Sequence, residues 1–381
     1  RPTAAESLRP ALEALLGGSA PVRFDLWDGS RIGPDDGDVT LRIHSADALR
    51  RLLWAPGELG VGRAYVAGDI DIDGDAVTGI TALRDVAPSN LRFGFRIAPA
   101  VLRSARRLGA LGRPLPPPSS EIRQRGRIHS RSRDARAVSH HYDVGNDFYR
   151  LVLGPSMTYS CARFVDTANL ADAQAAKHEL VCRKLGLHDG PGKRLLDVGC
   201  GWGSMAIHAA THHGATVVGI TISQEQAAEA RRRVIEAGLS DRIEIRLQDY
   251  RDLRDEQFDA ISSIGMFEHV GSERIAEYFT TLHGLLGDHG RVLNHAISSV
   301  GGSRIGARSF IGRYVFPDGE LIDVGEVVLA MERAGFEVRD VESLREHYAA
   351  TLRAWVANLE DRWEDAVQMV GLERARVWRM Y

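Results

Sequence analysis

The second half of the chain alternates short apolar runs with longer segments in which apolar residues recur at helical spacing. Short apolar runs that end in glycine or polar residues are typical of strands buried on both faces. They predict strands within residues 194–203, 215–223, 242–250, 258–271 and 290–298. The amphipathic segments between them predict helices at 204–214, 224–239 and 272–286. This alternation predicts an α/β fold, with a doubly wound parallel sheet covered by helices on both faces.

The first part of the chain follows another pattern. Residues 21–30 and 38–45 alternate apolar and polar positions, as half-buried strands do, with a turn at Asp28-Gly29. Residues 46–55 have helical period. We therefore expect a small α+β domain at residues 1–110.

A proline-rich stretch separates the two patterns. Residues 114–120 read PLPPPSS, which is typical of a stiff, extended linker. We expect a basic linker at residues 111–136 and the sheet-containing domain at residues 137–381.

The formal net charge of −3 hides an uneven distribution. Residues 91–136, called the basic belt below, hold twelve arginines against Glu121 and Asp134, so this segment carries +10 and the remainder −13. Such a belt indicates an anionic partner, either nucleic acid or a membrane surface. Its more apolar part, residues 91–111, is typical of an amphipathic surface that rests on lipid, and a solvated linker is the alternative.

Other features limit the cellular setting. The chain has no apolar run long enough to cross a membrane and no signal-peptide pattern, and its three cysteines lie too far apart to staple a fold of this size. We expect a cytoplasmic protein, peripherally associated with the inner face of the membrane.

The strongest local signal is the run Asp197-Val198-Gly199-Cys200-Gly201-Trp202-Gly203, between an expected strand and an expected helix. Glycines at this point let a ligand approach the backbone at the first crevice of the sheet. The following strand ends in 219–224, GITISQ, without the acidic residue that would bind the ribose of a nicotinamide cofactor. The pattern therefore favours another nucleotide-type ligand, and a turn that merely packs helix on strand is the alternative.

Two motifs resemble metal sites. The run from Asp69 through Asp71 and Asp73 to Gly74 matches the first half of a calcium loop, but Ile80 stands where that loop requires glutamate. We expect a turn with solvated aspartates. The pairs His140-His141 and His212-His213 have no partner at zinc spacing, so we expect no structural metal.

Several longer stretches resemble the S-adenosylmethionine-dependent cyclopropane fatty acid synthases, a family that includes the mycolic acid cyclopropane synthases and their methyl-branching relatives. They occur in family order and at family-like spacing: HHYDVGNDFY (140–149), MTYSCARF (157–164), LLDVGCGWG (195–203), GITISQEQ (219–226), QDYRDL (248–253), SIGMFEHVG (263–271), YVFPDGEL (314–321) and HYAATLRAW (347–355). More loosely, residues 58–74 resemble the family's N-terminal lipid-binding domain.

The resemblance implies a class I methyltransferase domain with a Rossmann-like sheet, and it implies a role for each matching residue. The residues implied at the cofactor are Tyr159 and Ser160 for its methionine end, Gly199, Gly201 and Gly203 beneath it, Thr221 and Gln226 for the ribose, and Gln248, Asp249 and Tyr250 around the adenine. The residues implied around a bound bicarbonate are Cys161, Glu268, His295, Ile297 and Tyr348. Cys161 and Ile297 would donate their backbone N–H groups.

The implied reaction transfers a methyl group from S-adenosylmethionine to the cis double bond of an unsaturated acyl chain on a membrane phospholipid. The alkene must be held in line with the methyl group in a dry slot, and the resulting carbocation must lose a carbon-bound proton. Loss from the new methyl group gives a cyclopropane, and loss from a neighbouring position gives a methylene. A separate reductase would convert the methylene to a methyl branch. The family precedent also implies a homodimer.

This sequence departs from the family pattern after the active-site histidine, where Ala296 and Ser298 replace the usual threonine and glycine. The family also usually continues about 30 residues beyond this point with a last helix and an edge strand, so either the chain is truncated or its end is not given. These departures leave the position of proton loss, and so the product, open.

Two other functions stay open: a methyltransferase that acts on a small molecule or RNA, and a non-catalytic lipid-binding protein. No aromatic-interleaved RNA platform accompanies the basic belt, so we expect no nucleic acid partner. The glycine turn together with Glu268, His295 and Tyr348 argues for an enzyme.

Overall fold

The computed structural model describes residues 2–86, 98–122, 133, 144–254, 256–300, 309–317 and 319–381. The chain forms two compact units: Arg1–Glu121 with Arg308–Tyr314 and Arg376–Tyr381, and Ile122–Ala307 with Val315–Ala375. The first unit thus takes in residues 111–121, which the sequence assigned to a linker, and two short segments from later in the chain.

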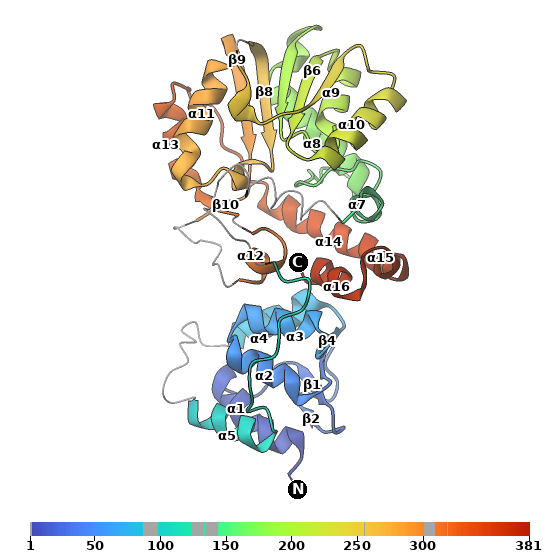
Figure 1. The fold of residues 1–381 in the computed structure, drawn as a ribbon, viewed down its shortest axis with the longest axis vertical. Helices are drawn as coiled ribbons and strands as arrows, with labels where there is room; N and C mark the ends of the chain where they lie inside the picture. Colours follow the sequence, from blue (N-terminus) through green and yellow to red (C-terminus); the bar gives the residue numbers. More distant parts are fainter. Residues whose placement is uncertain are drawn as a thin grey trace. The chain divides into compact units, whose positions relative to one another are not determined.

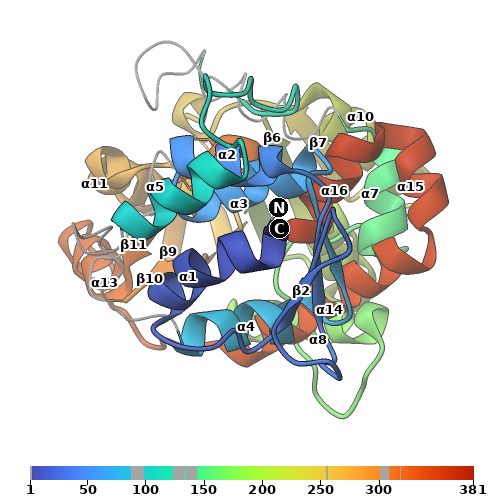
Figure 2. The same cartoon turned by 90° about the horizontal axis from the view of Figure 1, so that it is seen from below.

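The first unit contains a four-stranded sheet and the helices around it (Figures 1 and 2). The sheet has the order β2 (Arg31–Ile32), β1 (Arg23–Leu26), β3 (Thr40–Ile43) and β4 (Ile70–Asp73). The helices are α1 (Ala4–Leu16), α2 (Ala46–Trp54), α3 (Glu58–Val66), α4 (Ala76–Val86) and α5 (Ala98–Arg107). Alternate residues of β1, Phe24 and Leu26, are buried, which confirms the predicted half-buried strand.

The calcium-like run lies on strand β4 rather than in a turn. Asp69 pairs with Arg51, Asp71 with His44 and Arg376, and Asp73 with Arg42, so the expectation of solvated aspartates in a turn is wrong. The three carboxylates neutralise basic side chains and pin the strand into the first unit.

Helix α3 is where the two late segments join the first unit. The backbone N–H of Phe310, in α12 (Phe310–Tyr314), donates to Glu58 Oε1 over 3.0 Å. Arg376, in α16 (Leu372–Met380), donates to the Tyr65 carbonyl over 2.7 Å. A Cβ atom at Gly62 would lie 2.3 Å from the Phe310 ring, so this approach requires glycine.

The second unit is built on a five-stranded parallel sheet (Figure 1). Its order is β7 (Ile243–Leu247), β6 (Thr216–Thr221), β5 (Arg194–Val198), β8 (Phe258–Ile264) and β9 (Leu286–His295). Every pair of neighbouring strands is parallel, and the order reverses direction between β5 and β8. The predicted doubly wound sheet is confirmed.

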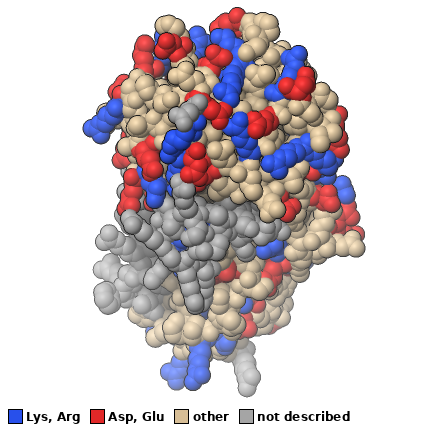
Figure 3. Space-filling view, turned by 45° about the horizontal axis from the view of Figure 1, so that its top comes forward, with Lys and Arg blue, Asp and Glu red and all other residues tan. Residues whose placement is uncertain are grey.

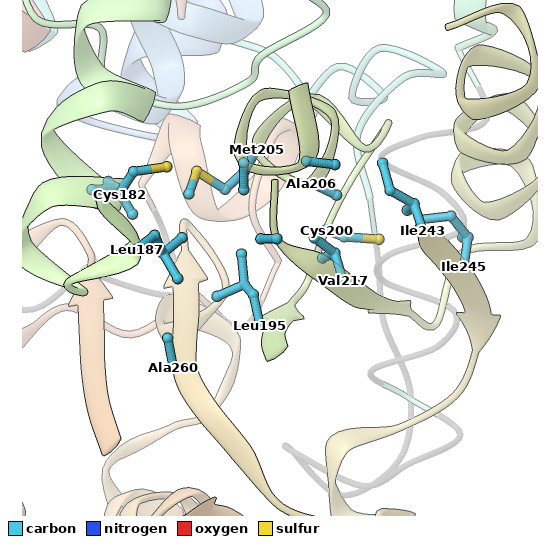
Figure 4. Close-up of a cluster of buried hydrophobic side chains, with 14 of the residues drawn as sticks. Cys182, Leu187, Leu195, Cys200, Met205, Ala206, Val217, Ile243, Ile245 and Ala260 are labelled. Atoms are coloured by element: carbon cyan, nitrogen blue, oxygen red, sulfur yellow. The ribbon is translucent and has the colours of Figure 1, made fainter. Parts of the chain in front are cut away.

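Helices cover both faces of this sheet because adjacent residues of each strand point to opposite sides. Leu195 packs with α8 (Leu170–Lys184), α9 (Ser204–His213) and α10 (Gln224–Glu236) in one core, part of which Figure 4 shows. Leu196 belongs to the other core, with α11 (Ile275–Gly284) and α13 (Val324–Arg333).

The remaining elements lie at the carboxyl ends of the strands or beyond them. They are α7 (Asn146–Leu153), α14 (Arg345–Asp361), α15 (Trp363–Val370), β10 (Ser298–Ser299), β11 (Ile322–Asp323) and four 3-10 turns at Leu187–Asp189, Tyr250–Asp252, Phe267–His269 and Ser272–Arg274. The Asn358 side chain of α14 donates to the Val152 carbonyl of α7 over 2.8 Å, which ties these two helices together.

Among the helices of the described residues, none is long and apolar enough to span a bilayer.

Seven of the twelve arginines of the basic belt lie outside the described residues, which include Arg103, Arg106, Arg107, Arg113 and Arg133. Helix α5 carries the first three on its exposed side, while Ser104 and Ala105 are buried. Elsewhere, Figure 3 shows positive and negative side chains interspersed over the visible face of the second unit.

Candidate active site

A pocket opens in the second unit where the parallel strands end. Val198, Ile220 and Ile264, at or next to the carboxyl ends of β5, β6 and β8, all line it. It encloses about 1190 Å³, open mouth included. Ligands of doubly wound sheets bind at this edge, near the point where the strand order reverses.

The glycine turn after β5 forms one wall. Gly199, Gly201 and Gly203 all have positive φ, at 75°, 55° and 80°. The N–H groups of Gly199 and Cys200 both donate to the Ile220 carbonyl over 2.9 Å, which fixes the turn against β6. Gly199 and Gly201 line the pocket, and a Cβ atom at Gly201 would meet no other atom within 4 Å.

Gly203 has a different place from the other two glycines. It is not among the residues that line the pocket, and its Cβ position faces Ala230 of α10 at 3.4 Å. Its function in the described structure is to begin α9 and to let α10 approach, rather than to lie beneath a ligand.

The other predicted cofactor residues gather around the same pocket. Thr221 and Gln226 are buried together, and the Thr221 hydroxyl donates to Gln226 Oε1 over 2.9 Å. The Asp249 carboxylate accepts two hydrogen bonds from Arg251 at 2.9 and 2.6 Å. The pocket is lined by nine of the ten predicted residues, namely Tyr159, Ser160, Gly199, Gly201, Thr221, Gln226, Gln248, Asp249 and Tyr250.

Two buried charged residues line the pocket although the sequence did not single them out. Lys177 is 1% exposed and donates to the Ser160 hydroxyl over 2.9 Å. Asp197 accepts from Ser262 over 2.8 Å, while its second oxygen is buried and bonds to no described residue. Burial lowers the pKa of Lys177 and raises the pKa of Asp197, because it disfavours both charged forms.

A signal for Lys177 was present in the sequence. It is one of only three lysines in a chain whose other basic residues are arginines. It also falls on the apolar face of the helix later seen as α8, beside Ala173 and Val181.

Aromatic rings surround the cofactor end of the pocket. Tyr159 lies 5.7 Å from the ring of Tyr149, 5.3 Å from that of Trp355 and 6.4 Å from that of Phe316. The ring of Tyr348 lies 6.2 Å from that of Trp355. Tyr159 lines the pocket, and the rings of Tyr149, Phe316 and Trp355 pack around it.

The predicted anion-binding residues fall into two groups. The Glu268 carboxylate accepts the Ile297 backbone N–H over 2.8 Å, while its second oxygen is buried and has no hydrogen bond to the described residues. The Ile297 N–H, expected to donate to an anion, thus donates to Glu268. Burial raises the pKa of Glu268.

His295 belongs near the first group, because it ends β9 beside Ile264 of the pocket wall. Burial lowers its pKa to about 4, so the imidazole is neutral at pH 7.

The second group lies at the start of α14. The Cys161 thiol contacts the Leu344 carbonyl at 3.6 Å, and the Tyr348 backbone N–H donates to the same carbonyl over 2.9 Å. Burial raises the pKa of the Cys161 thiol to about 11, so it is protonated and unsuited to act as a nucleophile.

The residues present fit a bound S-adenosylmethionine. The glycine turn admits a ligand close to the backbone, and Asp197 offers a buried oxygen that bonds to no described residue. Carboxylate, amide and hydroxyl groups line the rest of the pocket, and aromatic rings stand beside it. This donor set suits a molecule with a cationic centre and a nucleoside.

Comparison with known proteins agrees with this site. The family model for mycolic acid cyclopropane synthetase matches residues 129–381. A protein of Mycobacterium tuberculosis described as a probable fatty acid methyltransferase is 43% identical over 373 residues, which cover 96% of this chain and 87% of that protein. The cyclopropane-fatty-acyl-phospholipid synthase of Escherichia coli is 34% identical over 345 residues, covering 90% and 82%.

A solved structure resembles the second unit's architecture. The crystal structure of a mycolic acid cyclopropane synthase complexed with SAH and CTAB matches with a TM-score of 0.60 and 35% identity. The match covers 65% of this chain and 90% of that one. With the glycine turn, the pocket and these similarities taken together, the chain belongs to the family of S-adenosylmethionine-dependent cyclopropane synthases and fatty acid methyltransferases.

Proposed function

We propose that the enzyme methylates the cis double bond of an unsaturated fatty acyl chain carried by a membrane phospholipid. The observation that carries this proposal is the Glu268 carboxylate, buried beside a cofactor-sized pocket with one oxygen that bonds to no described residue. The E. coli relative is named for a fatty-acyl-phospholipid substrate, which supports the same substrate class.

When bound, S-adenosylmethionine supplies an electrophilic methyl group on a sulfonium. The chain's own residues then position the reactants: the glycine turn and Gln226 hold the cofactor side, and the rings of Tyr159 and Trp355 form a dry wall for the alkene. The alkene would take this methyl group from the bound cofactor, and its π electrons would form the new carbon–carbon bond as the carbon–sulfur bond broke. The acyl chain would then carry a carbocation.

The carbocation must then lose a proton, and we propose that a bound bicarbonate takes it. His295 is neutral at pH 7 and so offers an N–H to an anion, and the second oxygen of Glu268 is placed to accept the bicarbonate hydroxyl. Because the Ile297 N–H already donates to Glu268, the anion would rest on Glu268 and His295, with Tyr348 a further donor. The electrons of the broken C–H bond neutralise the cation.

The fate of the carbocation decides the product. Direct loss of a proton from the transferred methyl group closes a cyclopropane. If the hydride on the methyl-bearing carbon first shifts to the cationic carbon, loss of a proton from the same methyl group leaves a methylene, whereas loss from a neighbouring chain carbon leaves an internal alkene. We propose the methylene, a 10-methylene type of methyl-branch precursor, because the 43%-identical relative is named a probable fatty acid methyltransferase, whereas relatives named as cyclopropane synthases are 34% and 37% identical. A reductase would then have to supply hydride to complete the branch.

We propose that the protein reaches its substrate by resting on an anionic membrane. On α5, Leu102 is 59% exposed beside three exposed arginines, Arg103, Arg106 and Arg107. An apolar side chain among basic ones is the usual chemistry of helices that lie in the headgroup layer.

The test incubates the protein with methyl-labelled S-adenosylmethionine and vesicles of monounsaturated phosphatidylglycerol. The expected result is label in the lipid fraction, and mass spectrometry of the released fatty acid then distinguishes methylene from cyclopropane. Label in added RNA and none in lipid would overturn the proposed substrate. A cyclopropane product would overturn only the proposed fate of the carbocation.

A further inference from the structure

Helices α8 and α9 bring a group of metal-binding side chains together, on the side of the second unit's sheet that they cover. The ligand atoms of Cys182, His208 and His213 all lie within 4.8 Å of one another. Cys182 is fully buried, and the side chains of His208 and His213 are only 12% and 9% exposed. Figure 4 shows Cys182 on α8 pointing toward Met205 and Ala206 of α9.

A fourth donor completes the group. Glu179 Oε2 lies 2.9 Å from His213 Nε2 and 3.5 Å from His208 Nε2, so one carboxylate oxygen faces both rings. Its other oxygen accepts from Arg183 over 2.6 Å, which orients the carboxylate.

The Nε2 atom of His208 is buried and makes no hydrogen bond to the described residues. The Glu179 carboxylate oxygen, 3.5 Å away, lies beyond good hydrogen-bond distance of this nitrogen. A buried polar atom without a bond is costly, and a metal ion would satisfy it.

We propose that this cluster binds one zinc-class divalent cation through Cys182, His208, His213 and Glu179. A thiolate, two imidazoles and a carboxylate are a donor set that zinc accepts, with bonds of about 2.0–2.3 Å. Tetrahedral bonds of that length place donor atoms roughly 3.3–3.8 Å apart. The donor atoms of Cys182, His208 and His213, which lie within 4.8 Å of one another, would close by about 1 Å, and Glu179 Oε2, 2.9 Å from His213 Nε2, would move slightly away from that ring. The thiolate and the carboxylate together cancel the charge of the ion.

The site joins two helices that also shape the cofactor pocket. Lys177 and His178 of α8 and Ser204 and Met205 of α9 line that pocket. A metal bond between α8 and α9 therefore stabilises the pocket wall without touching the reacting atoms. Sequence spacing missed the site because His213 acquires its partners from a different helix.

The experiment titrates Co²⁺ into the full, chelator-dialysed protein under anaerobic conditions. We expect one equivalent to bind with a thiolate-to-cobalt charge-transfer band, and Zn²⁺ to displace it. We also expect Zn²⁺ to raise the Tm, because an ion that binds only the folded state stabilises it. These readouts are independent of the proposed reaction.

Matched variants identify the donors. Cys182→Ser should abolish the charge-transfer band, and Cys161→Ser should keep it. His213→Gln should weaken Co²⁺ binding by more than about tenfold, while the same change at the adjacent His212 should leave binding unchanged. If Cys182→Ser does not fold, the two histidine variants still decide the question.

Three results would overturn the proposal: no bound Co²⁺, binding without the charge-transfer band, or equal affinities for His213→Gln and His212→Gln. The last two would mean that histidines at the surface, rather than this cluster, hold the ion.

Discussion

At the scale of single residues, the site depends on charged groups held away from water. Glu268 keeps one oxygen on the Ile297 N–H and leaves the other buried without a hydrogen bond to the described residues. A buried polar atom of this kind costs stability and persists where function requires it. The carboxylate is therefore the residue whose chemistry is most open to test.

We predict that Glu268→Gln lowers turnover by about 10²–10⁴-fold, because the amide still accepts the Ile297 N–H but cannot hold the proton-accepting anion as the carboxylate does. Affinity for S-adenosylhomocysteine, measured by calorimetry, should stay within about twofold, since Glu268 does not line the cofactor pocket. The matched control is Glu273→Gln on the exposed turn that follows. Normal turnover in Glu268→Gln would show that the carboxylate has no part in proton removal.

Three buried histidines set a pH dependence of stability. Burial lowers the pKa of His178 well below its ordinary value, and it lowers the pKa of both His208 and His295 to about 4, from 6.5 in the unfolded chain. Below pH 6.5 the unfolded chain therefore takes up protons that the folded protein does not accept until about pH 4. The stability that these groups contribute is complete above pH 6.5 and is lost as the pH falls toward 4.

We predict that the free energy of unfolding, from urea titrations, falls between pH 6.5 and pH 4 by up to about 1.4 kcal/mol per pH unit for each histidine. His295→Gln should reduce the slope of the free energy of unfolding against pH. The control His188→Gln, at an exposed histidine, should leave that slope unchanged. An unchanged slope in His295→Gln would mean that this imidazole titrates normally.

At the scale of elements, close approaches between helices and neighbouring segments are set by glycine. Gly62 on α3 admits the ring of Phe310, and Gly203 admits α10 against the start of α9. The sequence showed both glycines, but their partners are distant in the chain.

We predict that Gly62→Ala lowers the free energy of unfolding by about 1–3 kcal/mol, because the added methyl would stand 2.3 Å from the Phe310 ring. Combining it with Phe310→Ala should recover part of that loss in a double-mutant cycle. The control is Gly284→Ala at the end of α11, where a Cβ atom meets nothing within 4 Å. Equal effects at the two glycines would contradict the crowding at α3.

How much could be predicted from sequence also differs between elements. The parallel sheet was predictable because strands that are buried on both faces must be apolar, and each strand appears in the sequence as an apolar run. Nine residues of the cofactor pocket were predictable because they belong to motifs next to the ends of these strands. The place of Lys177 in the pocket and the Cys182 cluster were not predictable, although the rarity of lysine marked Lys177, because each depends on which face of α8 meets the sheet and α9. Likewise, Gly203 and Gly201 belong to the same glycine motif. They differ in their surroundings, because a Cβ atom at Gly203 would contact Ala230 of α10 and one at Gly201 would contact nothing within 4 Å.

At the scale of the whole molecule, the two units carry different kinds of chemistry. The second holds the pocket and the charged residues around it. The first carries the exposed basic helix α5, whose arginines have no place in that pocket. Membrane binding and cofactor binding should therefore be separable by mutation.

We predict that changing Arg103, Arg106 and Arg107 together to glutamine weakens binding to anionic vesicles, with the larger loss at low salt, where charges are screened least. Affinity for S-adenosylhomocysteine should not change. The matched control neutralises three exposed arginines of the second unit, Arg242, Arg333 and Arg339. Equal loss in sedimentation assays for both triple variants would mean that overall charge, rather than α5, governs adsorption.

The composition of the first unit has a consequence for biosynthesis. Its sheet and α3 emerge early from the ribosome, yet Phe310 and Arg376, which bond to Glu58 and Tyr65, are translated much later. During that interval the Glu58 carboxylate and the Tyr65 carbonyl of α3 lack these two donors and remain exposed to solvent. The first unit is thus begun first and completed last, so a nascent chain would acquire this unit in final form only after the residues of the pocket have been made.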